Sequence, residues 1–289
     1  MTPPDGGTAR LLVQCQDRPG IVAAVSAFLF AHGANIVQAD QYSSDGGSGR
    51  FFLRMEYALT GLDLPPDALA ARFGAEVAPR FDMTWHVSYS TRRPRLAILV
   101  SKADHCLLDL LWRWRRDELA ADVRMVVSNH EALRDAVAPF ELPYHCLPIA
   151  NGGRPAQEAA VLQLLRGEVD LVVLARYMQV LSPAFVAAFP HAVINIHHSF
   201  LPAFAGADPY GQAFDRGVKI IGATAHYATE ELDDGPIIEQ DVVRVTHRDR
   251  RADLVRLGRE VERSVLARAV QWHLEDRVLV DGRKTVVFR

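Results

Sequence analysis

The stretch Val193-Ile-Asn-Ile-His-His-Ser-Phe-Leu-Pro202 decides the fold of this 289-residue chain. Its β-branched apolar residues are typical of the end of a buried strand. The stretch also carries one amide, Asn195, and two imidazoles, His197 and His198, before a loop that proline closes. In an open α/β sheet, ligands bind beyond the carboxyl ends of the strands. Polar side chains at this place are therefore candidates for a catalytic or binding site.

Strand and helix patterns alternate on both sides of this stretch, over residues 94–289. Strands are predicted at 95–101, 123–128, 144–149, 170–175 and 192–196, and helices at 106–118, 131–139, 156–167, 182–189 and 209–217. Further strands are predicted at 219–228 and 237–244, then a long helix at 249–272 and a short hairpin at 277–288. This alternation predicts an α/β fold with a doubly wound, mostly parallel sheet.

The N-terminal part has a different pattern. Strands are predicted at 10–16, 35–43, 51–59 and 83–90, and helices at 21–32 and 67–80. The order β-α-β-β-α-β is the ferredoxin-like pattern. The polar segment Thr91-Arg-Arg-Pro94 follows it, and such a proline-containing segment indicates a domain boundary. We therefore expect two domains, at 8–90 and 94–289.

Composition excludes several classes of protein. The formal charge of −3 does not favour nucleic-acid binding, which is usually marked by a basic excess. The cysteines at 15, 106 and 146 are too far apart for a disulfide framework and suit a reducing compartment. The N-terminus does not resemble a signal peptide, and no apolar run reaches the length of a membrane span. We expect a cytoplasmic protein that binds neither nucleic acid nor membrane.

Further polar residues lie in Thr224-Ala-His226 and in Leu232-Asp-Asp-Gly-Pro236. An amide, an imidazole and a carboxylate that come together can stabilise an oxyanion, move a proton and orient a water molecule. We therefore predict Asn195, His197 and Asp233 as catalytic residues.

Simpler roles stay open for some of these residues. Asn195 could cap the loop after its strand, because Asn is a common turn former, and His226 could be a buried histidine of a strand. The adjacent His197 and His198 could suggest a metal ion. Because the sequence has no His-x-x-x-His pair on a predicted helix and no cysteine cluster, we predict no metal site.

Several motifs together carry a resemblance to a known family. They are Asn195-Ile-His197, Ser199-Phe-Leu-Pro202, Gly222-x-Thr-x-His226, Leu232-Asp-Asp-Gly-Pro236 and Val172-Val-Leu-Ala-Arg-Tyr-Met-Gln-Val-Leu-Ser-Pro183. The C-terminal two-thirds of the chain resembles the formyltransferase fold of folate-dependent enzymes. The resemblance implies that folate binds at Met178, Gln179, Val180, Leu181, Thr224, His226 and Asp234.

The N-terminal part resembles an ACT domain, a small regulatory module. The motifs are Asp17-Arg-Pro-Gly-Ile21 and Gly33-Ala-Asn-Ile36. The resemblance implies an amino-acid effector, glycine or methionine, at Asp17, Arg18, Pro19, Gly20 and Asn35. The first four residues could equally form a plain turn before a helix. Because an open sheet edge invites a partner, we also expect a homo-oligomer.

The combination of the two parts resembles the family of formyltetrahydrofolate deformylases. That resemblance implies hydrolysis of 10-formyltetrahydrofolate to tetrahydrofolate and formate, without a further cofactor. The formate is used in purine synthesis, and the reaction balances the one-carbon pools. A transferase to a ribonucleotide needs a phosphate site after the first strand of this domain. The segment Val100-Ser-Lys-Ala-Asp-His-Cys106 has no glycine, and Asp104 would repel a phosphate, although Lys102 would partly offset it. A formyltransferase to an amine and a non-catalytic folate sensor remain the alternatives.

Overall fold

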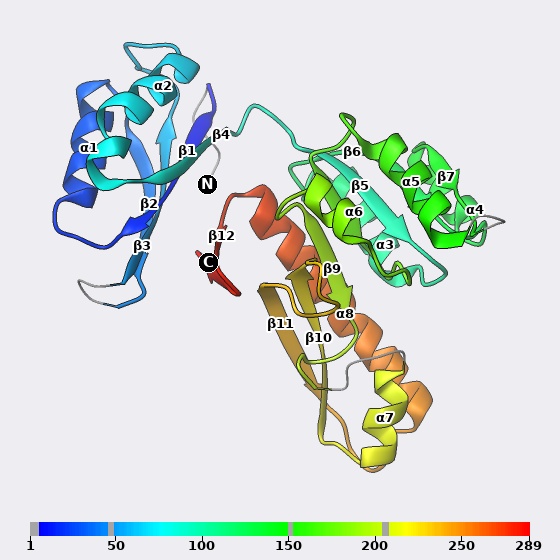
Figure 1. Cartoon of the computed structure of the whole chain (residues 1–289). Helices are drawn as coiled ribbons and strands as arrows, with labels where there is room; N and C mark the ends of the chain where they lie inside the picture. Colours follow the sequence, from blue (N-terminus) through cyan, green and yellow to red (C-terminus); the bar gives the residue numbers. More distant parts are fainter. Residues whose placement is uncertain (1–5, 46–48, 150–152, 204–207) are drawn as a thin grey trace. The chain divides into compact units, whose positions relative to one another are not determined.

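The computed structural model describes residues 6–45, 49–149, 153–203 and 208–289 (Figure 1). By their internal contacts these residues divide into two compact units. The first holds the chain up to Arg93 together with Asp276–Leu279 and Val286–Arg289. The second holds Pro94–Glu275 and Val280–Thr285. None of the helices in the described ranges is long and apolar enough to cross a membrane.

The N-terminal unit is a four-stranded antiparallel sheet with two helices, in the order β-α-β-β-α-β. Its elements are β1 (Thr8–Gln16), α1 (Ile21–Ala31), β2 (Ile36–Ser43), β3 (Arg50–Ala58), α2 (Pro66–Glu76), a 3₁₀ turn (Ala78–Phe81) and β4 (Thr84–Tyr89). The strands lie in the order β2-β3-β1-β4. The predicted ferredoxin-like, ACT-type pattern is confirmed.

The two faces of this sheet are covered differently, because side chains alternate between the faces along a strand. Leu11 and Leu53 face the helices and pack in the main core of the unit. On the other face, Phe52 packs in a buried cluster with Leu279 and Phe288 from the end of the chain. The C-terminal residues therefore complete the N-terminal unit.

The C-terminal unit is built on a seven-stranded sheet in the order β11-β10-β9-β8-β5-β6-β7. Its elements are β5 (Arg95–Val100), α3 (His105–Arg115), β6 (Asp122–Ser128), α4 (Arg134–Val137), a 3₁₀ turn (Ala138–Phe140), β7 (Tyr144–Cys146), α5 (Gly153–Leu165), β8 (Leu171–Leu174), α6 (Pro183–Ala188), β9 (Val193–His197), α7 (Pro209–Arg216), β10 (Ile220–Tyr227), β11 (Ile237–Arg244) and α8 (Arg251–Leu274). Strands β5 to β9 are parallel, and β10 is antiparallel to both of its neighbours. The predicted mostly parallel sheet is confirmed.

The last hairpin, β12 (Val278–Asp281) and β13 (Lys284–Val287), differs from the expectation that residues 94–289 form one domain. Its two ends belong with the N-terminal unit, and residues 280–285 around its turn belong with the C-terminal unit. Asp276, just before β12, accepts hydrogen bonds from Arg10 at 3.3 Å and from Ser88 at 2.5 Å. A hairpin pattern alone predicts the turn but not the surface on which the strands pack.

The strand arrangement explains where a site forms. Strands β8 and β9 are parallel neighbours, so their carboxyl ends, Leu174 and His197, meet at the same edge of the sheet. Strand β10 then returns beside β9 and places His226 opposite Asn195 and Thr224 opposite His197. Residues far apart in the sequence thus come together at one sheet edge.

We expect the contact between Phe288 and the N-terminal sheet to stabilise that unit. Phe288→Ala removes a buried aromatic ring, and the free energy for opening β3 should fall by about 3 kcal/mol. Native-state hydrogen exchange of the β3 amides measures this energy. Phe30→Ala in the same unit is the matched control, because the Phe30 side chain is 83% exposed, and its effect should stay within about 0.5 kcal/mol. Equal effects of the two variants would contradict the role of Phe288.

Candidate active site

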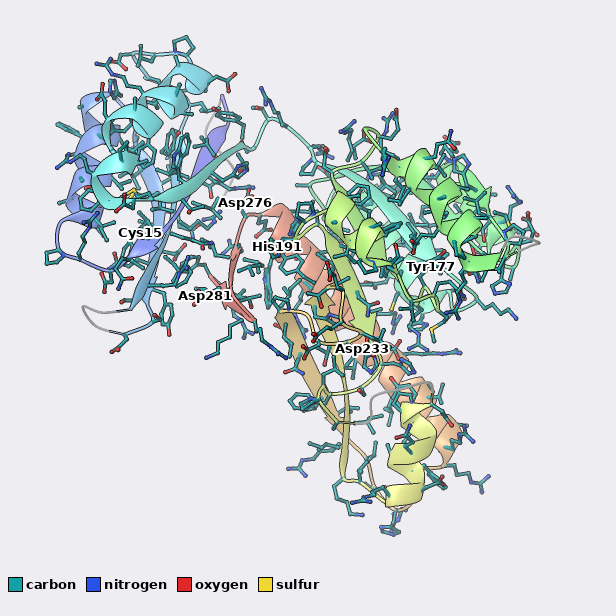
Figure 2. The ribbon with its side chains drawn as sticks, in the orientation of Figure 1. Cys15, Tyr177, His191, Asp233, Asp276 and Asp281 are labelled. Carbon is teal, nitrogen blue, oxygen red and sulfur yellow. The ribbon has the colours of Figure 1, made fainter. Side chains whose placement is uncertain are left out.

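The end of β9 presents two polar side chains, Asn195 and His197, to the same face of the sheet, because residues two apart in a strand share a face. Strand β10 adds His226 opposite Asn195. The loop between β10 and β11 adds Asp233 (Figure 2). Asp233 has a φ of 56°, in the left-handed region that Asp adopts more readily than most residues.

His197 and Asp233 form the central pair of this site. His197 Nδ1 lies 3.1 Å from Asp233 Oδ1. A carboxylate only accepts hydrogen bonds, so Nδ1 donates its proton to Asp233. Burial acts to raise the pKa of the Asp233 carboxyl, but the hydrogen bond from His197 and the electrostatic effect of the nearby imidazole rings hold that pKa below its ordinary value. Asp233 is therefore ionised at neutral pH.

The other nitrogen of His197, Nε2, is buried and has no hydrogen-bond partner among the residues that the structure describes. A buried polar atom without a partner costs free energy, so native proteins rarely leave one. Such an atom beside a cavity is suited to bind a substrate or a water molecule.

His226 plays a different part, because its hydrogen-bond partners are neutral groups and the Asp233 carboxylate lies farther away, 3.8 Å from its Nε2. Its Nδ1 lies 2.9 Å from the carbonyl oxygen of Tyr227, and its Nε2 lies 3.1 Å from Asn195 Nδ2. A carbonyl only accepts, so Nδ1 donates to it and Nε2 accepts from the Asn195 amide. Burial lowers the pKa of His226. The neutral ring thus orients Asn195 and leaves the second hydrogen of its amide for another acceptor.

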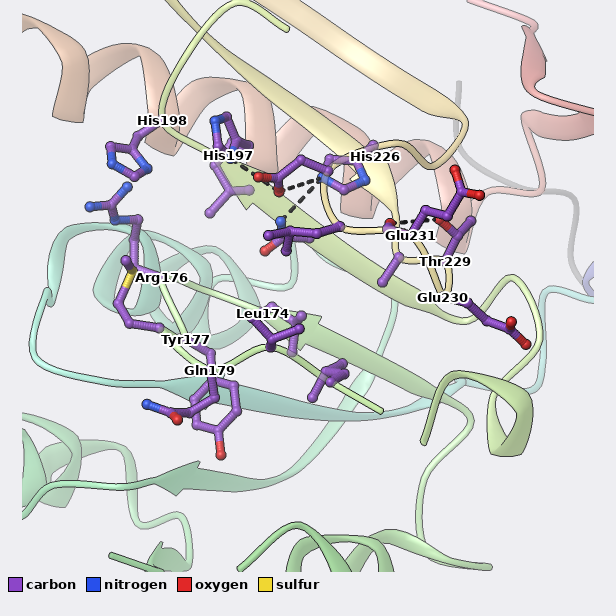
Figure 3. Close-up of a pocket in the computed structure, with 18 residues that line it drawn as sticks. Leu174, Arg176, Tyr177, Gln179, His197, His198, His226, Thr229, Glu230 and Glu231 are labelled. Atoms are coloured by element: carbon purple, nitrogen blue, oxygen red, sulfur yellow. Dashed lines mark hydrogen bonds and ion pairs between the residues drawn. The ribbon is translucent and has the colours of Figure 1, made fainter. Parts of the chain in front are cut away.

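These groups line one cavity of about 270 Å³. Its wall consists of Leu174, residues 176–181, residues 195–198, His226 and residues 228–233. Apolar side chains with a few convergent polar groups are the usual lining of a small-molecule site. Figure 3 shows the cavity between the ends of the strands and the loop that follows β10.

Most of the residues predicted to bind folate lie in this wall. Met178, Gln179, Val180, Leu181 and His226 line the cavity. Met178 and Val180 are about half exposed, which is unusual for apolar side chains of this size. The oxygen Oε1 of Gln179 is buried and makes no hydrogen bond with the described residues.

Thr224 and Asp234 were also predicted to bind substrate, but they do not appear in the cavity wall. The hydroxyl of Thr224 is buried, donates to the carbonyl oxygen of Ser199 at 2.8 Å and accepts from the Leu201 amide at 3.0 Å. These hydrogen bonds hold the loop after β9 in place, and the loop buries the Thr224 side chain. Asp234 forms an ion pair with Arg283 instead.

The predicted regulatory residues lie in the N-terminal unit. They are Asp17, Arg18, Pro19 and Gly20 in the turn before α1, and Asn35 before β2. Asp17 accepts a hydrogen bond from Ser43 at 2.5 Å, and Arg18 donates to the carbonyl oxygen of Arg80 at 2.7 Å. The side chain of Asn35 is exposed. Helix α1 begins without a side-chain cap and without an acidic residue in its first turn.

A buried polar cluster beside the cavity was not predicted. Glu262 of α8 accepts hydrogen bonds from His105 at 2.9 Å and from Tyr210 at 2.5 Å. Arg176 Nε lies 3.5 Å from the same carboxylate, and Arg176 also lines the cavity. Burial acts to raise the pKa of Glu262, but His105 and Arg176 hold it below the ordinary value, so Glu262 is ionised.

The ligand atoms of His105, Cys106 and Glu262 lie within 4.8 Å of one another, a set that can ligate metal ions in proteins. Here burial raises the pKa of the Cys106 thiol well above its ordinary value, so the sulfur keeps its proton. Glu262 already accepts two hydrogen bonds. We therefore interpret the cluster as a hydrogen-bonded support for Arg176.

Comparisons with known proteins agree with this architecture. Residues 94–270 match the family described as formyl transferase, and residues 9–56 match the ACT domain. The C-terminal unit also resembles a solved glycinamide ribonucleotide transformylase 1 from Symbiobacterium toebii, with a TM-score of 0.65 and 31% identity over 68% of this chain and 95% of that one. The fold and the site thus define a folate-type formyl transferase domain that is joined to an ACT domain.

Relatives that span both parts narrow the class. The formyltetrahydrofolate deformylase of Bacillus subtilis (strain 168) is 54% identical, over 96% of this chain and 93% of the relative. The enzyme of that name from Escherichia coli O6:H1 is 42% identical, over 94% of this chain and 95% of the relative. A solved formyltetrahydrofolate deformylase from Pseudomonas syringae pv. tomato has a TM-score of 0.94 and 50% identity, and the match covers 98% of this chain and 94% of that one. The chain belongs to the formyltetrahydrofolate deformylase family.

We expect His226 to make the stability of the protein depend on pH. Because burial lowers its pKa, the unfolded chain binds this proton in a range where the folded protein does not. The stability is fully present above the ordinary pKa of 6.5 and is lost as the pH falls from there toward the folded value. His226→Gln should flatten this loss by up to about 1.4 kcal/mol per pH unit.

Urea unfolding of wild type and variant, at several pH values below 6.5, measures the two slopes. His247→Gln is the matched control, because His247 is exposed. It should keep the wild-type slope. A His226→Gln variant with the wild-type slope would show that His226 is already charged in the folded protein.

Proposed function

We propose that the cavity hydrolyses 10-formyltetrahydrofolate to tetrahydrofolate and formate, with Asn195, His197 and Asp233 as the catalytic residues. The observation that carries the proposal is the unpartnered Nε2 of His197, in a ring that Asp233 orients, beside the amide of Asn195. The choice of substrate and reaction is supported by the relatives that are named formyltetrahydrofolate deformylase.

The proposed reaction begins when a water oxygen attacks the formyl carbon and the carbonyl electron pair moves onto the formyl oxygen. The Asn195 amide and, with the ring in its imidazolium form, His197 Nε2–H donate hydrogen bonds to this oxyanion, which is commonly the largest single contribution to such catalysis. The Asp233 carboxylate holds His197 through Oδ1, and its other oxygen positions the water and accepts its proton.

The tetrahedral intermediate then collapses. The bond between the formyl carbon and the folate nitrogen breaks, that nitrogen takes up a proton, and formate leaves. The nitrogen is aniline-like and is a better leaving group than an alkyl amine, so the proposed route needs no metal ion or further cofactor. The substrate itself is the folate.

The apolar wall at Met178, Val180 and Leu181 supports a site for the flat folate ring. The unpartnered Oε1 of Gln179 is an acceptor that fits a ring amino group. His226 acts on the substrate through Asn195. Thr224 and Asp234 act only through the loops that they hold in place.

We expect His197→Ala and Asp233→Asn each to lower the rate of formate release by about 10²–10³, because each removes a group that stabilises or orients the transition state. Binding of tetrahydrofolate, measured by calorimetry, should stay close to the wild-type value. His247→Ala, at an exposed position, should leave both quantities unchanged. Wild-type turnover in His197→Ala would refute the role assigned to this residue.

One assay separates the proposal from its alternatives. The purified protein is incubated with 10-formyltetrahydrofolate without any acceptor, and formate is followed. Release of formate supports the hydrolase. Release only after an amine is added supports a formyltransferase, and binding without release supports a folate sensor.

We also propose that the N-terminal unit binds an amino acid, glycine or methionine, at the turn of Asp17, Arg18, Pro19 and Gly20 and at Asn35. The uncapped first turn of α1 supports this, because its N–H groups suit a carboxylate.

We further propose that copies of the chain pair into a homo-oligomer. The exposed edge of β2, with Val37 and Tyr42 accessible, supports this pairing. Three free cysteines support a reducing, cytoplasmic location.

Calorimetric titration with glycine and with methionine tests the effector site. We expect one of them to bind, and Asn35→Ala to weaken that binding about tenfold through loss of one hydrogen bond. Formate release without effector should not change in this variant. If neither amino acid binds to the wild type, the proposed effectors are wrong.

A further inference from the structure

Arg176 lies in the cavity wall, directly beyond the carboxyl end of β8. Its backbone is fixed on the neighbouring strand, because its carbonyl oxygen accepts from the Ser101 amide at 3.2 Å and the Met178 amide donates to the Ser101 hydroxyl at 3.0 Å. Its φ is 63°, in the left-handed region. Only 16% of its side chain is exposed.

The guanidinium is held by residues from three helices. Glu262 of α8 lies 3.5 Å from Nε, and that carboxylate is itself held by His105 of α3 and Tyr210 of α7. The carboxylate side chain is 1% exposed. The position of the arginine is therefore set by a rigid, buried support.

The Arg176 guanidinium offsets the buried charge of Glu262, but its conformation and its side chain carry costs of their own. A residue other than glycine in the left-handed region costs about 1 kcal/mol or more. The nitrogens Nε and Nη1 are buried without a hydrogen-bond partner in the described part of the chain, which adds a further cost. A residue that is kept in spite of such costs, at the wall of a site, points to a function there.

The Arg176 side chain lines the same cavity as the proposed catalytic groups. Arg176 and His198 appear together at one end of the residues drawn in Figure 3, and Thr229, Glu230 and Glu231 at the other. The ring of His198 lies 5.3 Å from that of His197, between centroids, and both residues line the same cavity as Arg176. Arg176 thus bounds the cavity in which the formyl group is proposed to bind.

We propose that Arg176 determines the acceptor of the formyl group, by filling the space that an amine would need and by repelling its ammonium form. This inference rests on the proposed hydrolysis and deepens it. Water is small and uncharged and still reaches the formyl carbon. An alkyl amine in neutral solution is mostly a cation, and a fixed guanidinium in the cavity wall disfavours it by Coulomb repulsion. Arg176 is a specificity-determining residue in this scheme.

The two competing reactions differ only in the nucleophile. With water, a C–O bond forms, the bond to the folate nitrogen breaks, and formate and a proton are released. With an amine, a C–N bond forms, the same bond breaks, and the acceptor nitrogen loses a proton as the folate nitrogen gains one. The groups at Asn195 and His197 stabilise the oxyanion in both cases. The choice between the reactions therefore depends on access to the formyl carbon.

The test uses the full chain with Arg176→Gly, a change that also relieves the left-handed backbone strain. Protein, 10-formyltetrahydrofolate and either hydroxylamine or ethanolamine are incubated, and formate and the formylated amine are quantified by mass spectrometry against a protein-free blank. We expect the wild type to form formate almost exclusively. In the variant, the ratio of formylated amine to formate should rise by about tenfold or more. Arg176→Met, which removes the charge but keeps most of the bulk, should raise it less and chiefly for ethanolamine.

Each result decides the inference. Arg166→Gly is the matched control, since Arg166 is exposed and does not line the cavity, and it should keep the wild-type ratio. An unchanged ratio in Arg176→Gly, or loss of formate without any formylated amine, would overturn the inference. If Arg176→Gly does not fold, Arg176→Met is used instead. An unchanged ratio in that variant, or loss of formate without any formylated amine, would then overturn the inference. A wild type that releases no formate refutes the proposed function itself, and the inference falls with it.

Discussion

The hydrogen bond between His197 and Asp233 is the interaction on which the candidate site depends. It joins the end of β9 to the loop after β10, and therefore requires β10 to lie antiparallel to β9 in the observed register. A slip by one residue would turn His226 to the opposite face of the sheet and remove the partner of Asn195. The catalytic chemistry is thus a consequence of strand pairing as much as of the residues themselves.

The same register gives two neighbouring histidines different electrostatic environments. The hydrogen-bond partners of His226 are neutral, an amide and a carbonyl, and the Asp233 carboxylate, 3.8 Å from its Nε2, offsets its burial only in part. His197 has a carboxylate partner within 3.1 Å. One imidazole therefore acts as a fixed acceptor for Asn195, and the other presents a nitrogen to the cavity. Neither a single histidine nor two equivalent ones could supply both functions.

Asn195, His197 and Asp233 can be proposed from the sequence because each lies in a short, local motif. Asn195 and His197 end an apolar strand, and Asp233 lies in a turn rich in Asp, Gly and Pro. The cluster around Glu262 has no such signal. A glutamate in a long helix is usually solvated, and its burial here follows from the packing of α8 against α3, β9 and β10.

The hairpin at the end of the chain shows the same limit. Its turn at Asp281 and Gly282 is local and predictable, and its β12–β13 pairing follows from that turn. The packing of Leu279 and Phe288 on Phe52 depends on which sheet face is left uncovered, and this becomes known only when all four strands are in place. Local patterns predict elements, whereas the burial of charged groups and the covering of sheet faces require the assembled fold.

The ends of the adjacent parallel strands β8 and β9 contribute different groups to the site. In the proposed mechanism, the end of β9 supplies the groups that stabilise charge on the formyl oxygen, whichever nucleophile attacks. The end of β8 supplies the segment that begins with Arg176 and continues into the apolar wall. Under the proposal for Arg176, a change of acceptor needs a different side chain at the second strand end and none at the first. Because strand ends are held by the sheet while their side chains vary, such a change needs no rearrangement of the backbone.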